Sequence, residues 1–125
     1  MPLDPKTGLK IFGPVNEKAS ATYKAELFDP NNNAKITSLN SLEFSIHDSK
    51  TGQIIRDTES ILDTNGGDFT EGVLTLTLSA DDNRVINQRR LFEDHLGRFD
   101  FTYNNGTDTG HHAVIIRVRN LNFFS

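Results

Sequence analysis

The sequence contains no cysteine and no tryptophan among its 125 residues. Without thiols the chain has neither a disulfide framework nor a cysteine nucleophile, and it does not need an oxidising compartment. It also lacks an apolar run long enough to span a membrane. The first residues, Met1-Pro2-Leu3-Asp4-Pro5, have neither the basic region nor the apolar run of a signal peptide. We therefore expect the chain to be made in the cytoplasm.

Strong charge of either sign is missing as well. The formal net charge is −4, whereas a nucleic-acid-binding domain usually carries a basic patch. The adjacent Arg89 and Arg90 are too few to form such a footprint. We expect no nucleic-acid partner and no membrane partner. The length fits a single domain, and a domain of this size buries roughly two-thirds of its unfolded surface.

Short segments of alternating polarity fill the chain from Ala19 onward. Apolar residues at every second position place one face of each segment toward a core, as in half-buried strands. Turn-forming clusters separate the segments about every ten residues. We expect about seven strands, near 21–27, 42–47, 53–56, 61–62, 73–79, 98–103 and 112–118. The last two flank a polar loop and form an antiparallel hairpin, whereas the polar, glycine-rich residues 63–72 are expected to be a loop.

One short helix is expected near residues 80–87. Ser79 is followed three positions later by Asp82, the spacing of a capping box. Val85 and Ile86 would then lie beneath the sheet. Together these features predict an all-β fold, an antiparallel β-sandwich with one short helix. A small closed barrel is the structural alternative.

Both ends of the chain carry apolar groups outside this pattern. Residues 1–18 are broken by prolines and glycines and predict an extended N-terminal arm, followed by the sandwich with a short C-terminal tail over 19–125. The arm either lies on its own sandwich as an edge segment or docks on a neighbouring subunit. Exposed apolar groups mark interfaces, and the candidate partner-binding residues are Leu9, Ile11, Phe12, Val15, Phe123 and Phe124. The tail could equally continue the last strand and pack on its own domain.

No reactive constellation stands out. His111 and His112 are adjacent, so a strand would point them to opposite faces and they could not easily share a metal ion. The segment Asp63–Asp68 loosely resembles a calcium loop but lacks the full EF-hand pattern. Glu93 and His95 could pair by hydrogen bond or charge, as a structural pin at the sheet edge. We expect no enzyme and no catalytic, cofactor-binding or metal-binding residues.

In order and spacing, several segments resemble those of small Ig-like virion proteins encoded by tailed phages and prophages. These segments are 21–27, 42–48 with Thr51-Gly52, 72–78 with Asp81-Asp82, 90–95 leading into 98–103, and 110–112 with 114–118. The resemblance covers about residues 20–121 and leaves out the arm and the Phe-Phe tail. It implies an Ig-like sandwich with a non-enzymatic structural role in the particle, and it carries over no catalytic residue.

Three functions follow as hypotheses. The first is a capsid decoration or cement protein, a homo-oligomer that stabilises the phage head. It would contact the major capsid protein or other virion proteins through its arm and tail. A neck or tail accessory protein is the nearest alternative. A glycan-binding surface module is a weaker one, because Tyr23 and Tyr103, the two tyrosines, occupy inward positions. No cofactor is implied by any of the three.

Overall fold

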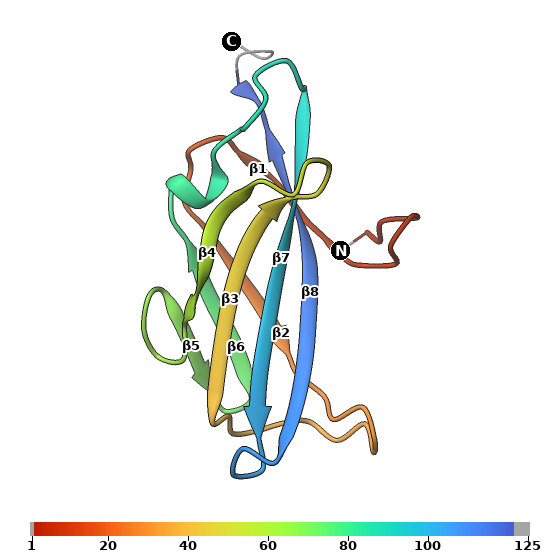
Figure 1. The fold of residues 1–125 in the computed structure, drawn as a ribbon, viewed down its shortest axis with the longest axis vertical. Coiled ribbons are helices and arrows are strands. Elements are labelled where there is room, and N and C mark those ends of the chain that lie inside the picture. The colour runs from red at the N-terminus through yellow and green to blue at the C-terminus, as the bar shows by residue number, and fades with distance from the viewer. Residues whose placement is uncertain (1, 122–125) are drawn as a thin grey trace.

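The computed structural model describes residues 2–121. Its longest elements are two strands joined as a hairpin (Figure 1). They are β7 (Phe92–Tyr103) and β8 (Asp108–Arg119), paired in register along their whole length. The alternation of phenylalanine and tyrosine with polar residues in β7 places Phe99, Phe101 and Tyr103 on the inward face, where each is at most 4% exposed. The hairpin predicted from the sequence is therefore confirmed, although both strands are longer than expected.

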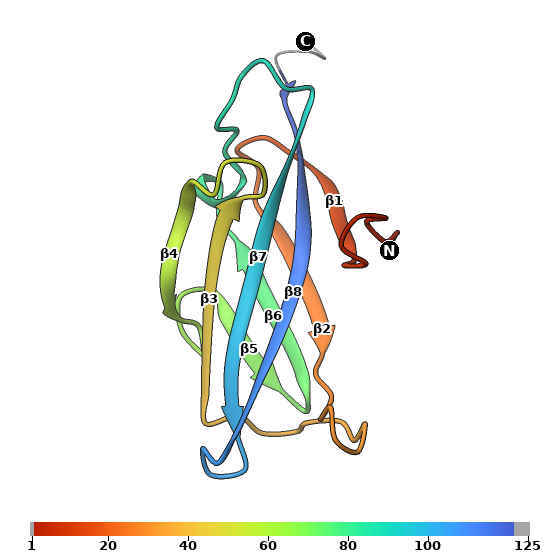
Figure 2. The ribbon, with the colours of Figure 1, turned by 45° about the vertical axis from the view of Figure 1, so that its right-hand side comes forward.

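Two sheets pack face to face, and the hairpin belongs to the larger one (Figure 2). The remaining strands are β1 (Ile11–Asn16), β2 (Ala21–Glu26), β3 (Ser41–Asp48), β4 (Ile54–Ser60), β5 (Gly67–Thr70) and β6 (Val73–Leu78). The larger sheet has the order β1-β8-β7-β3-β4 and the smaller one β2-β6-β5. All pairings are antiparallel except that of β1 with β8, among the residues described. The nearly all-β, two-sheet architecture matches the prediction from the sequence.

Apolar side chains from both sheets fill the space between them. Tyr23 from β2, Phe44 from β3 and Phe99 from β7 meet at its centre, each at most 2% exposed. Leu74, Leu76 and Leu78 cover them from β6 and are fully buried. Side chains of this size contribute roughly 1.5–3 kcal/mol each when buried. The core expected from the alternating pattern is the core observed.

The arm contains a strand of the molecule's own sheet. β1 runs parallel to β8, with Ile11 opposite Ile115 and Val15 opposite Val118. Its register shifts between Phe12 and Val15, where Pro14 has no N–H to offer to a further strand. Residues 2–10 fold back before it in a small turn, closed by a bridge between Leu3 and Lys10. The arm was expected either to lie on its own sandwich as an edge segment or to dock on a neighbouring subunit, and in the structure it lies on its own sandwich.

Two expectations for the middle of the chain are wrong in detail. Residues 63–72 were expected to be a loop, yet β5 lies within them and pairs with β6. Gly67 permits this, because a Cβ there would lie 2.0 Å from the carbonyl oxygen of Ile61. Ile61 itself follows the end of β4 as a fully buried core residue, whereas a short strand was expected there.

The helix expected near residues 80–87 is only one turn of 3₁₀ helix, η1 (Asp81–Asn83). The capping-box contacts are present: the Ser79 N–H donates to Asp82 Oδ2 at 2.8 Å, and the Asp82 N–H donates to Ser79 Oγ at 3.3 Å. Arg84 is already extended. Val85 is buried and Ile86 packs against the core, as expected. Farther along, the amides of Ile86 and Asn87 donate to the buried Glu93 and not to a helical carbonyl.

Candidate functional site: a buried Asp-Arg-Glu-His cluster

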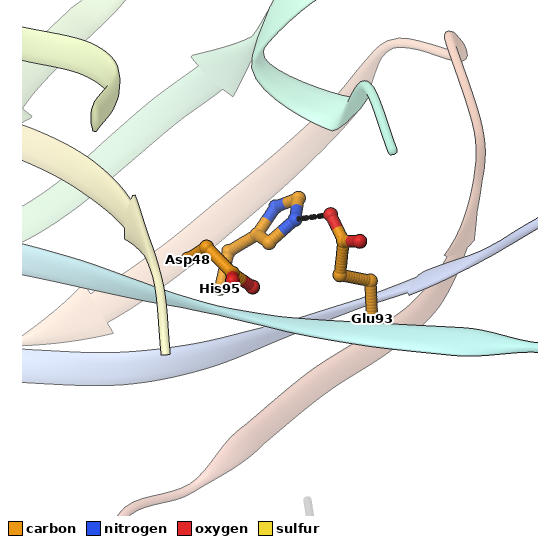
Figure 3. Close-up of side chains that lie close together, drawn as sticks. All are labelled: Asp48, Glu93 and His95. Atoms are coloured by element: carbon orange, nitrogen blue, oxygen red, sulfur yellow. Dashed lines mark hydrogen bonds and ion pairs between the residues drawn. The ribbon is translucent and has the colours of Figure 1, made fainter. Parts of the chain in front are cut away.

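Three ionisable side chains meet inside the upper end of the larger sheet (Figure 3). Asp48 is the last residue of β3, and Glu93 and His95 lie two positions apart on β7. A strand places residues i and i+2 on the same face, and here that face points inward, so that each of the three is at most 1% exposed. Arg90, from the loop that precedes β7, completes the cluster.

Glu93 is the acceptor at the centre of the cluster. Its Oε1 lies 2.6 Å from Nε2 of His95 and accepts the Ile86 N–H at 2.7 Å. Its Oε2 accepts the Asn87 N–H at 2.9 Å. Both oxygens thus accept backbone hydrogen bonds, and the His95 tautomer with its proton on Nε2 donates to Oε1 of a Glu93 carboxylate. The pairing of Glu93 with His95 expected from the sequence is confirmed.

Asp48 anchors the guanidinium of Arg90. Nη1 of Arg90 lies 2.8 Å from Asp48 Oδ1 and 3.4 Å from Glu93 Oε2. The backbone N–H and the hydroxyl of Thr51 donate to the other Asp48 oxygen at 3.1 and 2.7 Å. Burial acts to raise the pKa of Asp48, but the hydrogen bonds from Arg90 and Thr51 outweigh it and lower that pKa below its ordinary value.

A metal ion is the first chemical possibility for such a cluster. One ligand atom from each of Asp48, Glu93 and His95 lies within 4.8 Å of the others, and no other group of three acids or histidines does so among residues 2–121. However, the carboxylate oxygens already form hydrogen bonds with three side chains and three backbone amides. The positive charge between them is Arg90. The donor set therefore fits a cationic side chain better than a bound ion.

The cluster instead fixes a loop to the sheet. Glu93 binds the amides of Ile86 and Asn87, while Asn120 donates from Nδ2 to the carbonyls of Gln88 and Arg90 at 2.9 and 3.0 Å. Residues 86–90 are thus held by hydrogen bonds to β7 and to the residue that follows β8. Nδ1 of His95 is the one buried atom of the cluster without a partner. Sequence spacing could suggest Glu93 and His95, but Asp48 and Arg90 lie 42 positions apart.

The partner-binding residues expected in the arm lie largely against their own domain. Ile11 and Val15 are buried, with 6% and 9% exposed. Phe12 is half-buried and meets Tyr23 edge-on at 5.4 Å between ring centroids. Leu9 is half-buried as well. Phe123 and Phe124 lie outside the described residues.

Other apolar side chains, which the sequence pattern did not single out, are exposed at one end of the molecule. Leu91, Phe92 and Leu121 are 45%, 39% and 40% exposed. The Asn120 N–H donates to the Leu91 carbonyl at 3.0 Å, so Leu91 and Leu121 flank the same backbone hydrogen bond. We call these three residues the apical patch. The sequence feature that could have indicated this patch is the pair of adjacent apolar residues Leu91-Phe92 at the start of β7.

The remaining candidates from the sequence have local roles. Asp63 accepts the Phe69 N–H at 3.2 Å, and Asp68 accepts from the Thr70 hydroxyl. His111 and His112 point to opposite faces, as expected: His111 pairs with Asp100 on the outer face, and Nε2 of His112 lies 2.7 Å from the Tyr23 hydroxyl.

The Tyr23–His112 contact joins two neutral groups. Burial raises the pKa of Tyr23 to about 12 and, with the nearby charge of Lys10, lowers the pKa of His112. A neutral tyrosine can donate its O–H to the lone pair of a neutral imidazole. This hydrogen bond links β2 of the smaller sheet to β8 of the larger one.

Comparison with known proteins gives no relative for the chain. No protein-family model, curated protein or solved structure matches it. Within residues 2–121, no helix is long and apolar enough to cross a membrane.

Proposed function

We propose that this chain is a non-enzymatic structural protein of a phage particle, a capsid decoration or cement protein that contacts the major capsid protein or other virion proteins and acts as a homo-oligomer. Two lines of support stand behind the proposal. One is the resemblance of its segments to small Ig-like virion proteins. The other is an apolar surface, the apical patch, placed where a partner can reach it.

The apical patch is the single observation that carries the proposal. β3 pairs with β7 only as far as His95, so residues 92–94 of β7 pair with β8 alone. The open end of the hairpin, opposite its turn, therefore extends past β3 (Figure 1). It carries the exposed Phe92, and the exposed Leu91 and Leu121 lie at the same end. Contiguous exposed apolar groups mark sites of protein contact. We therefore assign the partner contact to this end of the hairpin. Ile11 and Val15, the contact residues expected from the sequence, are buried within their own domain.

We propose further that the sandwich is Ig-like. In a variable-type Ig domain, strands B, E and D form one sheet and strands G, F, C and C′ belong to the other. β2, β6 and β5 correspond to B, E and D, whereas β8, β7, β3 and β4 correspond to G, F, C and C′. The strand order supports the assignment.

The core offers a second line of support for the Ig-like assignment. Ig domains centre on a disulfide between strands B and F that packs on a tryptophan from strand C. At these places the chain has Tyr23, Phe99 and Phe44. The rings of Tyr23 and Phe99 are 5.9 Å apart and those of Phe44 and Phe99 are 4.6 Å apart. Three aromatic side chains fill the space of a disulfide and a tryptophan, which suits a chain without cysteine.

Mass spectrometry of purified particles tests the proposed function. Peptides of this chain at a copy number close to that of the major capsid protein are expected for a decoration protein. A copy number far below that of the major capsid protein would favour the alternative, a neck or tail accessory protein. Detection only in the particle-free lysate would refute a virion role.

Co-sedimentation then tests the apical patch. A Leu91→Ser/Leu121→Ser variant is expected to lose binding to particles that lack the protein. The matched control is Ile54→Ser, which removes a similarly apolar side chain, 52% exposed, from β4. Equal binding of the two variants to the particles would show that the apical patch is not part of the contact.

A further inference from the structure

A groove beside the apical patch gathers residues from four distant parts of the chain. Its walls come from the N-terminal turn over residues 4–7, the turn after β3, the loop before β7, and the ends of β7 and β8. Its volume is about 590 Å³, within the range of pockets that enclose a ligand or an anchoring side chain. We call it the basic groove.

Positive charge dominates the walls of the basic groove. Four cationic side chains line it, Lys6, Lys50, Arg90 and Arg117, against the two carboxylates of Asp4 and Asp94. Asp48 and Glu93, behind the wall, lie against Arg90, and Asp94 lies against Arg117, so the exposed positive charge of the groove comes from Lys6 and Lys50. Exposed cationic side chains in a concave surface attract ligands of the opposite sign.

The two arginines and the two lysines differ in what they can still bind. Arg117 is held by Asp94 at 2.8 and 3.0 Å, and Arg90 is held by Asp48. These pairs fix both guanidinium groups in place. Lys6 and Lys50 are exposed, and neither forms an ion pair with another residue in the part of the chain that is described. The lysines are therefore the charges that remain available to a ligand.

Apolar surface lies between these charges. Ile115 is almost fully buried in the groove wall, whereas Phe92 is 39% exposed and belongs to both the groove and the apical patch. Because Phe92 is shared, a ligand in the groove would extend the protein contact that we assign to the patch. A polynucleotide suits the groove less well, because its closely spaced phosphates require a larger basic surface than two exposed lysines provide.

We propose that the basic groove binds an acidic segment of a partner protein, with Lys6 and Lys50 pairing with its carboxylates and Phe92 receiving an apolar side chain. The identity of the partner as a virion protein rests on the proposed function. The charge and shape of the groove do not depend on it.

Fluorescence polarisation with a labelled peptide, in which glutamates flank a central leucine, tests this proposal. The wild-type chain is expected to bind it, and Lys6→Glu/Lys50→Glu is expected to lose at least about tenfold in affinity, because two attractions become repulsions. The control Lys18→Glu/Lys24→Glu makes the same charge change at exposed sites outside the groove and should bind almost as the wild type does.

Three results would overturn the proposal. They are equal binding of the same peptide with glutamine in place of glutamate, equal losses in the two charge-reversal variants, and tighter binding of a single-stranded oligothymidylate than of the acidic peptide. Failure of the proposed function looks different. Peptide binding that depends on Lys6 and Lys50, from a chain absent from particles, would leave the groove assignment standing and reject the virion role.

Discussion

Replacing Glu93 by glutamine tests whether the buried cluster holds the loop before β7. Glutamine keeps the shape but has one oxygen instead of two. If that oxygen remains near His95 and the Ile86 N–H, the new NH₂ group faces the Asn87 N–H and Arg90, which are donors as well. One unsatisfied buried donor costs about 1–3 kcal/mol, and breaking a buried charge pair costs about 3–5 kcal/mol.

We expect Glu93→Gln to lower the free energy of unfolding by about 2–4 kcal/mol. Urea unfolding measures this loss directly, and a midpoint lower by about 1–2 M is expected at an unchanged slope. Amide hydrogen exchange supplies the local readout. The amides of Ile86 and Asn87 should exchange faster, while those at the centre of β7 and β8 stay protected until global unfolding.

The matched control is Glu43→Gln, which makes the same chemical change at an exposed position of β3. Its free energy of unfolding should stay within about 0.5 kcal/mol of the wild-type value. If Glu93→Gln were as stable as this control and kept the Ile86 and Asn87 amides protected, the reasoning about the cluster would be refuted.

Three further predictions concern the core and its pH dependence. Phe99→Ala should cost about 3–5 kcal/mol of stability, whereas Phe28→Ala, at a residue 48% exposed, should cost much less; similar losses in urea unfolding would contradict the assigned core. Gly110→Ala should cost about 1–3 kcal/mol, because its Cβ would lie 2.5 Å from the ring of Phe101; an unchanged melting temperature would show that the ring moves freely. Burial lowers the pKa of His112, so the unfolded chain takes up this proton first and stability should fall as pH drops below about 6.5. Urea unfolding at several pH values should show a smaller loss of stability at low pH for His112→Gln than for the wild type. An equal loss in both proteins would contradict this role of His112.

The parts of the fold that follow from the sequence are those whose pattern is local. Alternation over β7 and β8 predicts both the hairpin and the inward placement of Phe99 and Phe101, because a period of two fixes which face is buried. Tyr23 and Phe44 follow by the same argument.

The parts that sequence analysis missed depend on distant partners. β5 has a polar, glycine-containing sequence and exists because β6 supplies its hydrogen bonds. The loop after η1 is not helical because Glu93, several positions later, accepts its amides. Within the cluster, the i, i+2 spacing suggests Glu93 and His95, but no local signal brings Asp48 to Arg90. Tertiary contact overrides propensity at each of these places.

The parallel pairing of β1 with β8 has a consequence for biosynthesis. Ile11 and its partner Ile115 are separated by 104 positions, and a ribosome adds roughly 5–20 residues per second. For about 5–20 seconds after its synthesis, β1 therefore has no β8 to pair with. Ile11 and Val15, buried in the finished molecule, remain open to chaperones or to other nascent chains during that time. The synthesis of β8 supplies the partner of β1 and ends this exposure.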